Sequence, residues 1–173
     1  RDKLVTGVQT CALPILNKAV ADELHAVHQY MYFHFHCDDQ GYELLSALFR
    51  RTAIEEMLHV EHLAERILFL KGEVNMVVGA DVLPIHDVQE MLAKAAAMEE
   101  ERARQYNIWA GECAAHHDSV TKQIFEQLVQ DEERHYDAYD NEIDNLKRFG
   151  PQYLALQSME RSKARAAGPG NAQ

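Results

Sequence analysis

Two segments of the chain carry glutamate and histidine residues at the same spacing, and this repeat restricts the fold more than any other feature. In each segment a second glutamate follows the first by 33 residues, and a histidine follows the second glutamate by three. The residues are Glu23, Glu56 and His59, then Glu99, Glu132 and His135. A spacing of three places two side chains on one face of a helix, about one turn apart. The repeat therefore predicts two similar helical halves.

Apolar residues at helical spacing surround each of these glutamates. Their periods of three and four predict four long helices, over residues 16–37, 42–70, 87–115 and 119–149. Ser119 is the expected N-cap of the last long helix, and a short fifth helix is expected over residues 153–161. Residues 72–86 show no helical period and are too many for a hairpin turn, so they are predicted to form a long crossover.

Two helical hairpins joined by one long crossover have the connectivity of a ferritin-like four-helix bundle. The sequence therefore predicts an all-α, ferritin-like antiparallel four-helix bundle with a long crossover and a short fifth C-terminal helix. Each long helix has one carboxylate within its apolar stripe. These inward carboxylates are Glu23, Glu56, Glu99 and Glu132.

Four buried carboxylates need positive charge close to them, because each would otherwise cost several kcal/mol to bury. Two divalent ions balance the four charges and leave both histidines neutral. Fe²⁺ favours carboxylate oxygen and imidazole nitrogen over an all-sulfur site. We therefore predict a dinuclear metal centre. The alternative is that these glutamates lie on solvated helix faces, as most helical glutamates do.

The composition limits the partners and the cell compartment. A formal charge of −11 argues against nucleic acid and favours a cationic partner. No apolar run approaches the length of a membrane span, so no membrane partner is expected. Cys11, Cys37 and Cys113 form neither a CxxC pair nor a disulfide framework, and we expect a reducing cytoplasm.

The two ends of the chain differ from its body. VTGVQTCALPI at residues 5–15 resembles the in-frame translation of a sequencing-library adapter, so we interpret residues 1–15 as a sequencing artefact or a disordered arm, with the natural N-terminus missing. Residues 16–160 are expected to form the diiron domain. Residues 161–173 are basic and rich in small residues, and we expect a disordered tail.

Several longer segments resemble one family, the bacterioferritins, which are the haem-containing branch of the ferritins. They lie within residues 16–157 and read ELHAVHQY, IEEMLHVEHLAERILFLKG, VQEML, LVQDEERH and QYLALQ. The resemblance implies that all six repeat residues are ferroxidase ligands, with Glu56 and Glu132 bridging two irons. It also implies that Tyr30 lies beside this site.

The same resemblance implies a function and partners. Bacterioferritins oxidise Fe(II) with dioxygen or peroxide and store the ferric mineral inside a shell of 24 chains built of dimers. The resemblance further implies a ferredoxin-type reductant for iron release. Met57 matches the methionine that binds haem b between two chains, and a thioether is a suitable axial ligand. The alternative for Met57 is that it packs in an interface.

Two other functions remain open at this point. A rubrerythrin-like diiron peroxidase would turn over without storing iron, but the chain has no CxxC electron-transfer module. A haem-binding redox module would need Met57 and no active diiron centre, whereas the ligand set is complete. The sequence leaves open the oxidant, whether haem is bound, whether the irons are permanent or in transit, and whether one chain type builds the shell.

Overall fold

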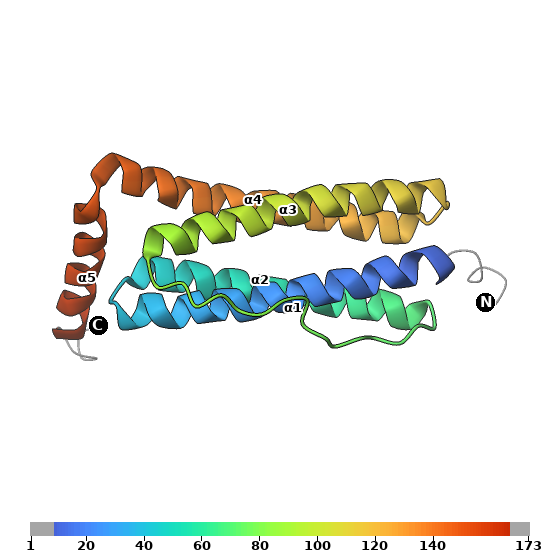
Figure 1. The fold of residues 1–173 in the computed structure, drawn as a ribbon, viewed down its shortest axis with the longest axis horizontal. Helices are drawn as coiled ribbons and strands as arrows, with labels where there is room; N and C mark the ends of the chain where they lie inside the picture. Colours follow the sequence, from blue (N-terminus) through green and yellow to red (C-terminus); the bar gives the residue numbers. More distant parts are fainter. Residues whose placement is uncertain (1–8, 167–173) are drawn as a thin grey trace, which may run out of the picture.

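The computed structural model describes residues 9–166 of the chain. Over these residues the chain forms helices and no strand. The helices are α1 (Gln9–Asp39), α2 (Glu43–Phe69), α3 (Val88–Ala115), α4 (Ser119–Phe149) and α5 (Pro151–Ala166). Helices α1 to α4 lie side by side in one elongated bundle, and α5 turns across one end of it (Figure 1). The predicted all-α bundle with a short fifth helix is confirmed.

The bundle consists of two helical hairpins. Helix α1 packs chiefly on α2, and α3 packs chiefly on α4, as expected for helices joined by short turns. The segment between α2 and α3 runs along the length of the bundle before α3 begins, as the sequence predicted (Figure 1).

Hydrogen bonds to α1 hold this crossover in place. The side-chain amide of Gln29 donates to the carbonyl of Leu83 at 3.0 Å and accepts from the Leu83 backbone N–H at 2.8 Å. The backbone N–H of Gly79 donates to the carbonyl of Ala21 at 2.9 Å. A Cβ at position 79 would lie 2.9 Å from that oxygen, so the close approach favours glycine.

The start of α4 differs from the prediction. Ser119 is the first helical residue, and Asp118 is the N-cap, because its carboxylate accepts the backbone N–H of Thr121 at 3.1 Å. The same carboxylate accepts from Arg66 Nη2 at 2.7 Å. A buried ion pair with α2 therefore determines where α4 begins, and sequence spacing alone does not reveal this pair.

The N-terminal boundary also differs from the prediction. Helix α1 begins at Gln9, so residues 9–15 are not a disordered arm. Ala12 is buried, and Leu13 packs against the same apolar cluster as Leu16. The helix extends because these apolar residues continue its inward face. The interpretation of this stretch as a sequencing artefact stays a prediction, and residues 1–8 lie outside the described residues.

The C-terminal tail was predicted to begin at residue 161, but α5 continues to Ala166. Arg161 is 9% exposed, and its guanidinium binds the carboxylate of Asp38 at 3.0 Å and donates to the carbonyl of Asp38. These contacts anchor the second half of α5 at the end of α1. Residues 167–173 of the predicted tail lie outside the described residues.

A polar layer divides the core of the bundle into two apolar clusters. The cluster toward α5 includes Tyr30, Phe49 and Tyr139. The cluster toward the other end includes Leu63 and Phe125. The buried charged residues named below lie on the same helices between the two clusters. No described helix is apolar over enough of its length to cross a membrane, and the three cysteines are free.

Candidate metal centre

All six residues of the sequence repeat meet in the middle of the bundle. Each of the four long helices contributes one glutamate, and α2 and α4 add one histidine each. The six side chains are no more than 5% exposed: Glu23, Glu56, His59, Glu99, Glu132 and His135. The alternative that these glutamates lie on solvated faces is therefore wrong.

The six residues form two overlapping groups. In each group, one oxygen or nitrogen atom per residue lies within 4.8 Å of the others. The groups are Glu23, Glu56, His59 and Glu132, and Glu56, Glu99, Glu132 and His135. We call them the His59 group and the His135 group. Glu56 and Glu132 belong to both, which is the placement that two bridging carboxylates need.

Several buried polar atoms in the centre have no hydrogen-bond partner. They include both oxygens of Glu56 and the Nδ1 atoms of His59 and His135. Nδ1 of His59 lies 2.8 Å from Glu56 Oε2, yet the two atoms do not meet at a hydrogen-bonding angle. An unsatisfied buried polar group costs about 1–3 kcal/mol. Unpaired oxygen and nitrogen atoms that converge are what a pair of divalent cations would satisfy.

The outer nitrogens of both histidines face carboxylates of the opposite hairpin. Nε2 of His135 lies 2.6 Å from Glu55 Oε2, and Nε2 of His59 lies 3.6 Å from Asp131 Oδ2. A carboxylate on one ring nitrogen holds a proton there and orients the other nitrogen toward a metal. Nδ1 of each histidine therefore faces the carboxylates of the centre and is the nitrogen available to a metal ion.

Sequence reasoning missed these two outer carboxylates. Glu55 is partly buried and also accepts from Arg134 Nη1 at 2.9 Å. A signal was present, because an acidic residue directly precedes the glutamate of each Glu-x-x-His motif. These acidic residues are Glu55 and Asp131.

Two tyrosines follow the same repeat that relates the two halves of the centre. The hydroxyl of Tyr30 on α1 donates to Glu99, and that of Tyr106 on α3 donates to Glu23 Oε1 at 2.5 Å. Burial raises the pKa of both phenols, so both stay protonated donors. Tyr30 was expected beside the site, whereas Tyr106 was not assigned to it. Each tyrosine follows its glutamate by seven residues, which places both on one helix face.

Arg102 breaks this symmetry. Its side chain is buried, and Nη2 donates to Glu99 Oε1 at 2.7 Å and to the Tyr30 hydroxyl at 2.8 Å. The guanidinium also lies 3.5 Å from Glu56 Oε1 and 3.4 Å from Glu132 Oε2. The sequence offered one signal for Arg102, which is a basic residue three positions after an inward glutamate. The first half has Ala26 at the matching position.

The carboxylates and cations of the centre shift one another's pKa values. Burial lowers the pKa of His59, but Glu132, Glu23 and Glu56 raise it more strongly, to about 12. The pKa of His135 is likewise raised against burial by its carboxylate neighbours. Burial raises the pKa of Glu56, but Arg102 and the two histidines hold it at about 2. Two imidazolium groups and one guanidinium therefore offset the charge of the carboxylates in the metal-free centre.

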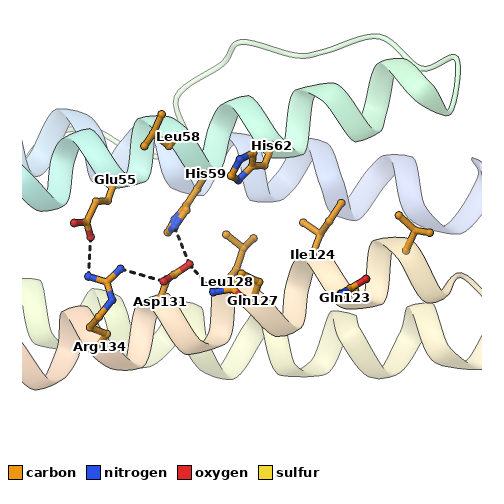
Figure 2. Close-up of a pocket in the computed structure, with 11 residues that line it drawn as sticks. Glu55, Leu58, His59, His62, Gln123, Ile124, Gln127, Leu128, Asp131 and Arg134 are labelled. Atoms are coloured by element: carbon orange, nitrogen blue, oxygen red, sulfur yellow. Dashed lines mark hydrogen bonds and ion pairs between the residues drawn. The ribbon is translucent and has the colours of Figure 1, made fainter.

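A surface groove between α2 and α4 leads to the centre. It has a volume of about 570 Å³ and is lined by His59, Asp131, His62 and Gln127, among others. Figure 2 shows His59 and Asp131 facing each other across the groove, with Arg134 between Asp131 and Glu55. The groove gives solvent access to the outer side of the His59 group.

A four-helix bundle with two such overlapping groups defines a dinuclear carboxylate protein. The model of the ferritin-like domain matches residues 14–149. Bacterioferritins from Desulfovibrio desulfuricans and Rhodobacter capsulatus are 36% and 37% identical to the chain, each over 83% of it and over 80% and 89% of their own lengths. The chain belongs to the ferritin-like family and, within it, to the bacterioferritins.

A solved structure agrees with this assignment. The crystal structure of the Desulfovibrio desulfuricans bacterioferritin, which describes its diiron site in different catalytic states, superimposes with a TM-score of 0.85. The two chains are 34% identical, and the match covers 87% of this chain and 88% of that one. The resemblance that the sequence motifs indicated is confirmed.

Proposed function

We propose that this protein is a ferroxidase that stores iron. Two Fe²⁺ ions would bind as substrate, one in the His59 group and one in the His135 group, and would be oxidised there. The product would then pass to a ferric mineral inside a shell of identical or related chains. The observation that carries this proposal is the pair of overlapping ligand groups, which share Glu56 and Glu132.

The donor set suits both binding and oxidation. Two divalent ions carry four positive charges and offset the four buried carboxylates, which removes the cost of burying them. Carboxylate oxygens are hard ligands and stabilise Fe³⁺ more than Fe²⁺, so they favour loss of an electron. Each Fe²⁺ gives up one electron, and the pair reduces dioxygen to peroxide, or peroxide to water.

The protein side chains would handle the protons of this reaction. Nδ1 of His59 and of His135 must release a proton before it can bind iron. Glu55 would hold the proton on Nε2 of His135, whereas Asp131 lies 3.6 Å from Nε2 of His59 and favours a proton there through its charge alone. Tyr30 and Tyr106 hold Glu99 and Glu23 in place through their hydroxyls. This chemistry takes place in a site that the helices shield from bulk water.

The test is rapid mixing of the assembled protein with Fe²⁺ and oxygen. We expect Glu56→Ala and His135→Ala each to abolish the fast phase of Fe²⁺ oxidation, since one removes a shared ligand and the other a nitrogen ligand. Glu61→Ala is the matched control, because Glu61 lies on α2 but is exposed. Unchanged initial rates in both site variants would contradict the assignment of the centre.

Storage is a separate part of the proposal and needs a separate measurement. Relatives named bacterioferritin support it. A 24-chain shell should load far more iron than its centres can hold, so iron per particle is measured together with particle size. About two irons per chain, with sustained peroxide turnover, would instead support the rubrerythrin-like peroxidase.

We also propose that Met57 binds haem b between two chains. Met57 is 53% exposed on α2, one residue from the buried Glu56, and its neighbours Ile54 and Leu58 are 38% and 44% exposed. An exposed thioether among apolar side chains suits a soft axial ligand at an interface. The same exposure also fits packing in a dimer interface, which is the competing interpretation.

Haem reconstitution separates these two roles of Met57. We expect Met57→Leu to lose the Soret absorbance while keeping its rate of Fe²⁺ oxidation and its oligomeric size. Met76→Leu is the control, because Met76 is an exposed methionine in the crossover. Wild-type protein that takes up no haem would rule out the haem role.

For the cell compartment, we propose a reducing cytoplasm with a ferredoxin-type reductant that releases stored iron.

A further inference from the structure

Arg102 contacts the two ligand groups unequally, because it binds the shared Glu56 and Glu132 and also Glu99, which belongs to the His135 group alone. Its guanidinium lies within 3.5 Å of the three carboxylates of the His135 group, which are Glu56, Glu99 and Glu132. Glu23, the carboxylate that belongs to the His59 group alone, has no hydrogen bond or ion pair with Arg102 among the described contacts. The two halves of the centre are therefore electrostatically unequal, although their ligands repeat.

A cation in the His135 group must compete with this guanidinium. Glu99 Oε1 already accepts a charge-assisted hydrogen bond of 2.7 Å from Arg102, and such bonds are stronger than those between neutral groups. A metal ion that binds Glu99 has to break this contact and must also lie beside a positive charge. A metal ion in the His59 group would take Glu23 and His59, neither of which pairs with Arg102, and would meet Arg102 only at its longer contacts of 3.5 Å and 3.4 Å with the shared Glu56 and Glu132.

A pocket beside Arg102 offers space for its guanidinium to move into. This pocket of about 320 Å³ opens on the side of the bundle between α1 and α3, and Arg102 forms part of its wall. Asp22 and Glu101 line the same pocket and offer carboxylate oxygens to a displaced guanidinium, although Glu101 also pairs with the exposed Arg104 at 2.8 Å. An arginine side chain is long and flexible enough to move its head group while its backbone stays in the helix.

This pocket is poorly suited to conduct iron. Lys18 and Lys94 also line it, and their ammonium groups repel a divalent cation about twice as strongly as the singly charged guanidinium. The groove between α2 and α4 differs, because Glu55 and Asp131 line it together with His59 and His62. The α1/α3 pocket therefore serves the guanidinium better than it serves the substrate.

We propose that Arg102 is a built-in counter-cation that competes with the metal ion of the His135 group and moves toward Asp22 and Glu101 when that ion binds. The inference rests on the proposed dinuclear site and adds an order of loading. The His59 group binds its ion tightly, and the His135 group binds a second, exchangeable ion. A labile second ion suits iron that is passing to a mineral more than iron that stays as a permanent cofactor.

The test uses Co²⁺, which binds oxygen and nitrogen ligands without being oxidised by air. Calorimetric titration of the assembled wild-type protein should show two unequal sites per chain. Arg102→Gln removes the charge but retains a polar side chain. We expect it to tighten the weaker site about tenfold to hundredfold, the equivalent of losing one charge-assisted hydrogen bond, and to leave the tighter site within about threefold.

A second variant acts in the opposite direction. Asp22→Asn combined with Glu101→Gln removes the two negative charges that would attract the displaced guanidinium and changes none of the six candidate ligands. We expect it to weaken the second Co²⁺ site several-fold and to leave the first unchanged. This variant decides the question if Arg102→Gln does not fold.

The outcomes separate the two proposals. A wild-type protein that binds no Co²⁺ in its centre would contradict the dinuclear site itself. Two Co²⁺ ions of equal affinity in wild type, or a second site that Arg102→Gln leaves unchanged or weakens, would overturn the role of Arg102 and leave the dinuclear site standing. A second site that the Asp22→Asn, Glu101→Gln variant does not weaken would also overturn it.

Discussion

The contacts on the outer nitrogens of the two histidines predict unequal effects from two equivalent substitutions. Nε2 of His135 lies 2.6 Å from Glu55 Oε2, which is a short charge-assisted contact. Nε2 of His59 lies 3.6 Å from Asp131 Oδ2, beyond hydrogen-bond range. The two carboxylates are otherwise alike, since their side chains are 27% and 23% exposed and each pairs with Arg134.

The magnitude follows from these distances. Loss of a carboxylate behind a metal-binding histidine costs about tenfold to a hundredfold in metal affinity, or about 1.4–2.7 kcal/mol. Glu55→Gln should reach this range, because the negative charge is lost and the amide oxygen that replaces the carboxylate is a weaker acceptor of the Nε2 proton. Asp131→Asn should cost less than about threefold, because it has no direct hydrogen bond to lose.

Co²⁺ titration of the assembled protein measures both effects, with Glu61→Gln on the exposed face of α2 as a control that should match wild type. Each variant should lower the affinity of one site and leave the other nearly unchanged. The reasoning is refuted if Glu55→Gln stays within twofold of wild type. It is also refuted if Asp131→Asn loses as much affinity as Glu55→Gln.

Two further predictions concern stability and pH. Asp118→Ala removes the N-cap of α4 and the carboxylate that pairs with the partly buried Arg66, which keeps its hydrogen bond to Thr121. Denaturant unfolding should show a loss of about 2–4 kcal/mol, against about 1 kcal/mol for Asp87→Ala at the exposed N-cap of α3. Equal losses would contradict a contribution from the Arg66–Asp118 pair. The pKa of His59 is raised to about 12 and that of His135 is also raised, so both hold a proton at neutral pH that metal binding releases. Metal affinity should therefore rise with pH, about tenfold per unit for each proton released, and calorimetry in two buffers of different ionisation enthalpy should detect that release; binding without proton release would contradict the raised pKa values.

The helices and the six inward ligands were predictable because they depend on local geometry. Residues three apart on a helix share a face in any protein, so Glu56 with His59 and Glu132 with His135 were paired before any fold was known. The apolar stripes then identified the inward face, and two short turns with one long crossover left one common topology. Helix boundaries were less predictable, because Arg66 and Arg161 determine them through contacts with distant residues.

The fold class, the family and the six inward side chains of the candidate centre could be predicted from the sequence, since each of these follows from spacing within one helix or from motif similarity. What surrounds those side chains depends on the tertiary structure. The guanidinium of Arg102 contacts the carboxylates of Glu56, Glu99 and Glu132, which lie on three different helices. Glu55 contacts a histidine 80 residues away, and Tyr106 donates to a glutamate 83 residues away. Such contacts depend on how far each helix is rotated and shifted against its neighbours, and one helical period contains no information about that register.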